Sequence, residues 1–122
     1  MIDHVSFGCA DLDAAAALYA RLLGCLGYEQ TRRDPAAAAF GRDGSLVFWL
    51  NRVEGAAVAG AGSHVAFAAA APAQVDALGA LARAEGLTIR RPPGRRPDIG
   101  PAYYGIVLED RDGNVIEAVA YD

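Results

Sequence analysis

The hydrophobic and polar positions follow the same order of patterns twice along the chain. A short strand pattern carries the motif His-Val-x-Phe at residues 4–7 and again at residues 64–67. Each motif precedes a segment whose apolar residues recur at helical spacing. Asp11 is suited to cap the first helix, and Pro72 fits the first turn of the second helix. The pattern therefore predicts an internal repeat.

The ends of the two halves match as well. Arg-Asp-Gly at residues 42–44 leads into the apolar run 45–50, and Arg-Asp-Gly at residues 111–113 leads into the run 114–119. An Asp-Gly turn beside an apolar run indicates a β-hairpin. Between its helix and this last strand, each half has room for further short strands. Each half is therefore predicted to have the element order βαβββ, which makes an α+β fold.

The predicted organisation is one domain, residues 1–122, built from two modules. Module one covers about residues 1–52 and module two about residues 62–122. The Ala- and Gly-rich segment of about residues 53–61 is the predicted linker, and residues 92–101 are predicted to form an irregular loop. The chain has 122 residues, 53% of them apolar, so it can bury a core without disulfides or metal ions.

A duplicated βαβββ unit, a histidine on each first strand and an Asp-x-Asp-Gly-Asn-x-x-Glu ending resemble the vicinal oxygen chelate superfamily. This group contains the glyoxalases, the bleomycin-resistance proteins and the extradiol dioxygenases. The resemblance covers the whole chain, and its most specific part is residues 103–119. It implies that the two modules curve into a half-open barrel around a metal cleft. It also implies a homodimer, because short members usually complete their clefts by pairing subunits.

The candidate metal ligands are His4, His64 and Glu117. The chain has two histidines, and the repeat places both at the equivalent position. Glu117 interrupts an otherwise apolar strand, where a charge is costly unless it is paired or bound to metal. Two imidazoles and one carboxylate suit one divalent ion such as Fe, Mn, Ni or Zn, with positions left for water and substrate. The alternative for each residue is an ordinary solvated or packed side chain.

The remaining candidates surround this predicted metal site. Aligning the repeats puts Phe48 opposite Glu117, so we expect no fourth ligand from the first half. Glu117 or a metal-bound hydroxide is the candidate base. Arg96, in a loop rich in arginine, and Tyr104 are the candidates for orienting a substrate that carries negative charge. A solvated basic loop and a tyrosine packed in the core are the alternatives for these two residues.

Three functions are weighed. The resemblance implies a metal-dependent enzyme of the lyase, isomerase or dioxygenase type that acts on a small oxygenated substrate. The alternative is a bleomycin-resistance type of protein that binds a ligand without chemistry, although such binders generally lack the histidine pair. A fosfomycin-type transferase is less favoured, because the chain contains no lysine and no evident cation-binding loop. The lack of a third histidine also disfavours extradiol cleavage.

The charge of the chain limits the classes of partner that it can bind, and its cysteine content indicates the state of its thiols. The net charge of −4 and the isoelectric point near 5.0 argue against nucleic acid or an anionic membrane as a partner. Cys9 and Cys25 have no metal-ligand spacing and are too few for a disulfide framework. No basic segment followed by a long apolar run opens the sequence. We therefore expect a cytoplasmic protein with reduced thiols and a small-molecule substrate.

Overall fold

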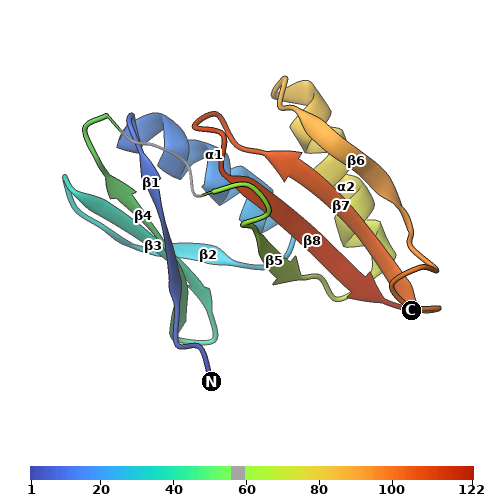
Figure 1. The fold of residues 1–122 in the computed structure, drawn as a ribbon. Helices are drawn as coiled ribbons and strands as arrows, with labels where there is room; N and C mark the ends of the chain where they lie inside the picture. Colours follow the sequence, from blue (N-terminus) through green and yellow to red (C-terminus); the bar gives the residue numbers. More distant parts are fainter. Residues whose placement is uncertain (56–59) are drawn as a thin grey trace. The chain divides into compact units, whose positions relative to one another are not determined.

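The computed structural model describes residues 1–55 and 60–122. Residues 56–59, in the middle of the predicted linker, lie outside the described residues. The chain divides into two compact units, Met1–Val58 and Ala59–Asp122, and each is one βαβββ module (Figure 1). The α+β fold class and the duplicated module are therefore confirmed. The curved arrangement of the two modules around a common cleft stays a prediction.

The first unit holds one helix against a four-stranded sheet. Its elements are β1 (Val5–Cys9), α1 (Leu12–Gly24), β2 (Glu29–Arg33), β3 (Ala37–Arg42) and β4 (Ser45–Arg52). The strand order is β1-β4-β3-β2, with β1 parallel to β4 and the other pairs antiparallel. Tyr19 of α1 packs on Phe48 of β4, with ring centroids 5.0 Å apart. Both side chains are fully buried, so this contact lies at the centre of the unit's core.

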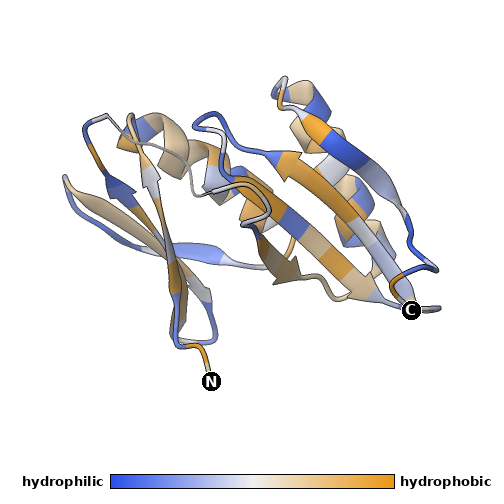
Figure 2. Ribbon diagram, in the orientation of Figure 1, coloured by the Kyte–Doolittle hydropathy of each residue, from blue (hydrophilic) through white to orange (hydrophobic). Residues whose placement is uncertain are grey.

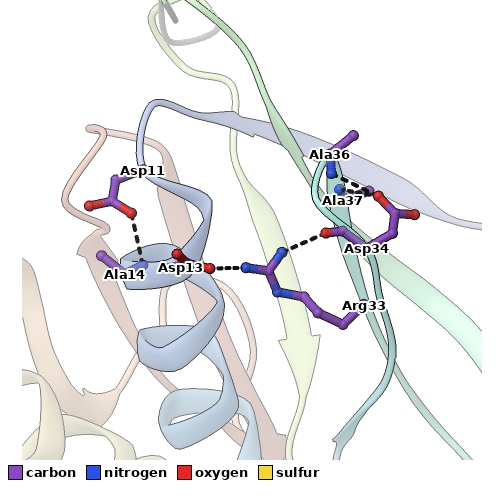
Figure 3. A network of polar contacts seen from close by, with 7 residues as sticks. All are labelled: Asp11, Asp13, Ala14, Arg33, Asp34, Ala36 and Ala37. Atoms are coloured by element: carbon purple, nitrogen blue, oxygen red, sulfur yellow. Dashed lines mark hydrogen bonds and ion pairs between the residues drawn. The ribbon is translucent and has the colours of Figure 1, made fainter.

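Polar contacts fix the start of α1 beside the turn between β2 and β3 (Figure 3). Asp11 is the N-cap and accepts a hydrogen bond from the backbone N–H of Ala14 at 3.1 Å. Asp13, in the first turn, forms an ion pair with Arg33, which also donates to the carbonyl of Asp34 at 2.7 Å. These contacts cap one backbone N–H of the helix N-terminus and join α1 to the end of β2 through an ion pair.

The second unit repeats the element order of the first and has a hydrophilic edge strand. Its elements are β5 (Val65–Ala68), α2 (Pro72–Ala84), β6 (Ile89–Arg95), β7 (Tyr103–Glu109) and β8 (Val115–Tyr121), in the strand order β5-β8-β7-β6. The predicted loop of residues 92–101 is wrong in its first part, because β6 continues to Arg95. Prolines 92 and 93 fit there because β6 is an edge strand. Figure 2 shows β6 hydrophilic along much of its length, beside a more hydrophobic β7.

One β-bulge distinguishes the last hairpins of the two units. In the first unit Phe40 pairs with Phe48 but Gly41 pairs with Leu46, so Val47 is an extra residue. A Cβ atom on Gly41 would lie 1.4 Å from the carbonyl oxygen of Ser45, so the bulge requires glycine there. The β7–β8 hairpin keeps a regular register throughout. Counted from the Asp-Gly turn, each later residue of β4 therefore corresponds to a residue of β8 that lies one position nearer to its own turn.

Among the residues that the structure describes, no helix is long and apolar enough to cross a membrane.

Candidate functional site

The alternation of β8 places one carboxylate on the face of the second sheet that α2 does not cover. Ile116, Ala118 and Ala120 are buried on the helix side of the strand. Glu117 points to the other face, and its side chain is only 11% exposed. The residues that flank Glu117 on its own face, Val115 and Val119 of β8, are apolar and line the same cavity. A carboxylate in such a place needs a cationic partner.

His64 is that carboxylate's neighbour. Its Nε2 atom lies 3.4 Å from Oε2 of Glu117. Its Nδ1 atom lies 3.2 Å from the carbonyl oxygen of Gly62. A carbonyl oxygen only accepts hydrogen bonds, so Nδ1 carries the hydrogen in this contact. In the neutral ring Nε2 then presents a lone pair toward Glu117, and a metal ion or a proton between the two atoms is needed to make the pair attractive.

A cavity of about 580 Å³ opens beside this pair, and all of its lining residues belong to the second unit. One part of its wall is apolar or aromatic: Ile99, Tyr103, Val107, Val115, Val119 and Tyr121. The other part carries three arginines, Arg90, Arg91 and Arg96. The small Ala66, beside Glu117 in the sheet register, leaves room next to the carboxylate. The cavity thus combines a His–carboxylate pair, an apolar wall and cationic groups.

The three arginines differ in their partners. Arg90 pairs with Glu109 at 3.1 Å. Arg96 forms a fork with Asp98, with Nε 2.8 Å and Nη2 2.5 Å from the two carboxylate oxygens. The hydrogen bond to Asp98 raises the pKa of Arg96, and the charge of Glu117 acts in the same direction. Arg96, the sequence's candidate for holding a substrate, is therefore in the cavity but is already bound by a carboxylate of its own chain.

The structure corrects the choice of tyrosine. Tyr103 lines the cavity and packs edge-to-face on Tyr121, with ring centroids 5.8 Å apart. Tyr104 points to the helix side, where its hydroxyl donates to Asp76 of α2 at 2.5 Å. The prediction that Tyr104 faces the substrate is wrong, because the phase of alternation in β7 is the opposite of the one chosen. Two adjacent tyrosines give no signal that fixes this phase from the sequence.

His4 belongs to the first unit and has its own surroundings there. Its Nδ1 atom lies 2.7 Å from a carboxylate oxygen of Asp3, and its ring meets Trp49 edge-on at 6.4 Å. Ser6 pairs with Trp49 as Ala66 pairs with Glu117, so Trp49 is the counterpart of Glu117. The alignment of Phe48 with Glu117 is wrong by one residue, because the bulge at Val47 shifts the strand. Neither aromatic side chain can bind a metal ion.

The donor groups of the chain set its capacity to bind a metal ion. Within residues 1–55 and 60–122, no three His, Cys, Asp or Glu side chains gather closely enough to hold a metal ion. His64 and Glu117 are the two donors that the second unit brings together. The third predicted ligand, His4, lies in the first unit, and its part in a shared set stays a prediction.

Comparisons with known proteins agree with this duplicated fold. A glyoxalase/bleomycin resistance protein from Albidiferax ferrireducens is 32% identical over 97% of each chain, with a TM-score of 0.86. A glyoxalase/bleomycin resistance protein/dioxygenase family enzyme from Burkholderia phytofirmans is 20% identical over 99% of this chain and 98% of its own, with a TM-score of 0.75. A genomically encoded fosfomycin resistance protein from Listeria monocytogenes is 17% identical over 100% of this chain and 93% of its own, with a TM-score of 0.74.

The last two likenesses concern the fold alone. A search of curated proteins found no match. The family model of the Glyoxalase/Bleomycin resistance protein/Dioxygenase superfamily matches residues 1–118, which is nearly the whole chain. The chain belongs to the glyoxalase/bleomycin resistance protein/dioxygenase superfamily.

Proposed function

We propose that the protein is a metal-dependent enzyme that acts on a small oxygenated substrate in the cavity of the second unit. His64 and Glu117 are the ligands that this unit contributes to one divalent ion, Fe, Mn, Ni or Zn. The observation that carries the proposal is the approach of Nε2 of His64 to Oε2 of Glu117 at 3.4 Å, with Nδ1 turned to the carbonyl of Gly62. A metal-bound histidine characteristically donates its other ring N–H in this way.

The distance between the two donors fits this assignment. Two ligands at about 2.0–2.2 Å from one ion, at octahedral or tetrahedral angles, lie roughly 2.8–3.6 Å apart. The pair also has the mixed nitrogen and oxygen character that these transition metals accept. When bound, the ion supplies Lewis acidity to the chelated oxygen atoms of a substrate.

The chain's own residues define the rest of the chemistry. The side chain of Glu117 is only 11% exposed, and this burial strengthens its interaction with a cation in the cavity. As a carboxylate beside the reacting oxygen atoms, it is also placed to accept a proton. Tyr103 and Tyr121 form an aromatic wall on the apolar side of the cavity. These roles suit a lyase, an isomerase or a dioxygenase.

Metal titration of matched variants tests the proposal. We expect calorimetry to show one tight site for Ni²⁺ or Zn²⁺ in the wild type. We expect Glu117→Gln and His64→Ala each to weaken it at least tenfold, because each change removes a ligand. Glu109→Gln is the control, since it neutralises a carboxylate on the neighbouring strand that is paired with Arg90. Equal affinity in Glu117→Gln and the wild type would falsify the metal assignment.

Turnover then separates an enzyme from a protein that only binds. We expect metal-loaded wild type to convert at least one member of a panel of 2-oxoaldehyde thiol adducts, catechols and epoxides, and chelator to abolish the reaction. Tight binding of an intact ligand without turnover in the loaded protein would favour the sequestering function instead.

One further prediction from the family concerns the assembly. Members of the superfamily bind small molecules and often dimerise. We propose that this protein forms a homodimer with an isologous interface, and sedimentation velocity at micromolar concentration should show a dimer. Sedimentation of the monomer alone would contradict it. The cytoplasmic location stays a prediction from the sequence.

A further inference from the structure

We propose that Arg91 is the specificity-determining residue of the cavity, and that it binds an oxyanion, a carboxylate or a phosphoryl group, on the substrate. The inference deepens the proposed function, on which it rests for the position of the reacting end. It names the charge of the substrate and the side chain that recognises this charge.

The sheet register places Arg91 in line with the His–carboxylate pair. Arg91 of β6 pairs with Val107 of β7, and Val107 pairs with Glu117 of β8. All three residues line the cavity. Two strand spacings separate the backbone of Arg91 from that of Glu117, about 9.5 Å. A small molecule lying across Val107 can therefore touch both ends at once.

A bulge in β6 gives this strand two arginines on one face. Ile89 pairs with Leu108 and Arg91 pairs with Val107, so Arg90 is an extra residue. Consecutive residues of a regular strand point to opposite faces, whereas a bulge re-aims one of them. Both Arg90 and Arg91 line the cavity as a result. The bulge therefore adds a second cation where a regular strand would supply one.

Arg91 is the arginine of this cavity that has no bonded acidic partner among the described residues. Arg90 is held by Glu109, and Arg96 by Asp98. Arg91 influences Asp98 through space, but no ion pair or hydrogen bond joins them. Its guanidinium keeps all of its donors available, and their planar fork matches two oxygen atoms of a carboxylate or phosphoryl group.

The apolar wall defines the rest of the ligand. Val107 lies between the two polar ends, and Val119, Tyr103 and Tyr121 extend the apolar surface along the sheet. A body of hydrocarbon or aromatic character fits against these side chains. The substrate class is therefore an apolar molecule with oxygen atoms for the metal ligands at one end and an oxyanion at the other.

Binding of small anions to the metal-free protein tests the inference separately from metal chemistry. The probes are benzoate, phenylphosphonate and the neutral benzamide, titrated by NMR in the presence of chelator. We expect the wild type to bind at least one anion more tightly than benzamide. Arg91→Gln should weaken that anion roughly tenfold or more and leave benzamide unchanged, because it removes charge-assisted hydrogen bonds.

Two more variants isolate the cause. Arg95→Gln removes the same charge from the same strand, but Arg95 is bound to Asp122 at 2.9 Å, so anion affinity should change less than twofold. Arg91→Lys keeps the charge without the fork and should bind with intermediate affinity. The tighter of the two anions identifies the oxyanion as carboxylate or phosphoryl.

Equal anion affinity in Arg91→Gln and the wild type would overturn the inference. So would equal affinity of the wild type for benzamide and both anions, or a loss in Arg95→Gln as large as that in Arg91→Gln. If the anions bind as expected while metal titration fails, the proposed function falls and the oxyanion site stands.

Discussion

The hydroxyl of Tyr104 illustrates how one hydrogen bond couples a strand to its helix. It donates to Asp76 of α2 at 2.5 Å, and this bond raises the pKa of Tyr104. A raised pKa in the folded state means that the bond's stabilisation is fully present below the unfolded-state value of about 10. The stabilisation is lost as pH rises through the folded-state value. The pair therefore stabilises the protein at neutral pH and not in strong alkali.

We predict that Tyr104→Phe lowers the free energy of unfolding by about 1 kcal/mol at pH 7, after allowance for solvent screening at this surface. The difference from the wild type should shrink above about pH 10, where the wild type also loses the bond. Urea unfolding at pH 7 and above about pH 10 measures this difference in the free energy of unfolding. Tyr121→Phe is the control, because Tyr121 is 71% exposed and lies on the other face. A pH-independent difference would contradict the assigned role.

Single residues show where sequence reasoning succeeds and where it fails. Glu117 drew attention because a charge in an apolar strand needs a reason, and the repeat singled out His64 together with His4. The structure brings His64 and Glu117 to 3.4 Å, and their role as metal ligands stays a prediction. Arg91 and Tyr103 were not predictable in the same way. Arg91 faces the cavity because a bulge at Arg90 shifts β6 by one residue. Tyr103 faces it because of the phase of β7, which two adjacent tyrosines leave undetermined in the sequence. A bulge adds one residue without leaving a reliable mark in the hydrophobic pattern.

At the scale of elements, the close approach of α2 to β6 positions the cationic edge of the cavity. A Cβ atom on Gly79 of α2 would lie 2.6 Å from Cγ of Pro93 in β6. That distance is too short for real Cβ contacts, and a proline ring is not flexible enough to move away cheaply. Gly79 therefore lets the helix lie against the strand that carries Arg91.

We predict that Gly79→Ala destabilises the protein by about 1–3 kcal/mol, the typical cost of overpacking. It should also weaken binding of the anion probe, because β6 must shift. Gly24→Ala is the matched control, since nothing lies within 4 Å of a Cβ there and alanine favours a helix. Thermal unfolding and the NMR titration of the preceding section provide the two readouts. Wild-type stability in Gly79→Ala would show that the strand adapts at no cost.

The elements themselves were largely predictable, for physical reasons. Each helix begins at a recognisable residue, Asp11 as N-cap and Pro72 in the first turn, and the structure confirms both starts. The repeated Asp-Gly turns likewise mark both closing hairpins. The offset of the first hairpin could not be predicted, because Gly41 and Val47 look like ordinary strand residues in the sequence. It became visible only as a change of pairing partner in the sheet.

At the scale of the whole molecule, the duplication gives two sheets of the same topology with unequal chemistry. Where the second unit has Glu117 beside Ala66, the first has Trp49 beside Ser6. The guanidinium of Arg32 lies 5.7 Å from the centre of the Trp49 ring, and the ring of His4 meets the same indole. The first unit by itself therefore retains the histidine but presents an aromatic surface in place of the carboxylate.

This inequality leads to a prediction about how a bound ion stabilises the chain. Metal at a hundredfold excess over its Kd should raise the free energy of unfolding by about 2.7 kcal/mol. His64 directly precedes β5, and Glu117 lies in β8. Metal bound between them should therefore slow hydrogen exchange in these two strands. Lower pH should reduce this protection, because protons compete with the metal for the ligands. Glu117→Gln, which lacks one ligand, should show little protection at the same metal concentration.

The same measurement tests the sequence prediction for His4. If His4 is a third ligand, metal should also slow exchange in β1, and His4→Ala should remove that effect while weaker protection of β5 and β8 remains. Asp3→Asn is the control, because it changes the neighbour of the His4 ring without removing the imidazole. Exchange in β1 that does not respond to metal would exclude His4 from the ligand set. The ion would then be held by the second unit's pair together with water or substrate oxygen atoms.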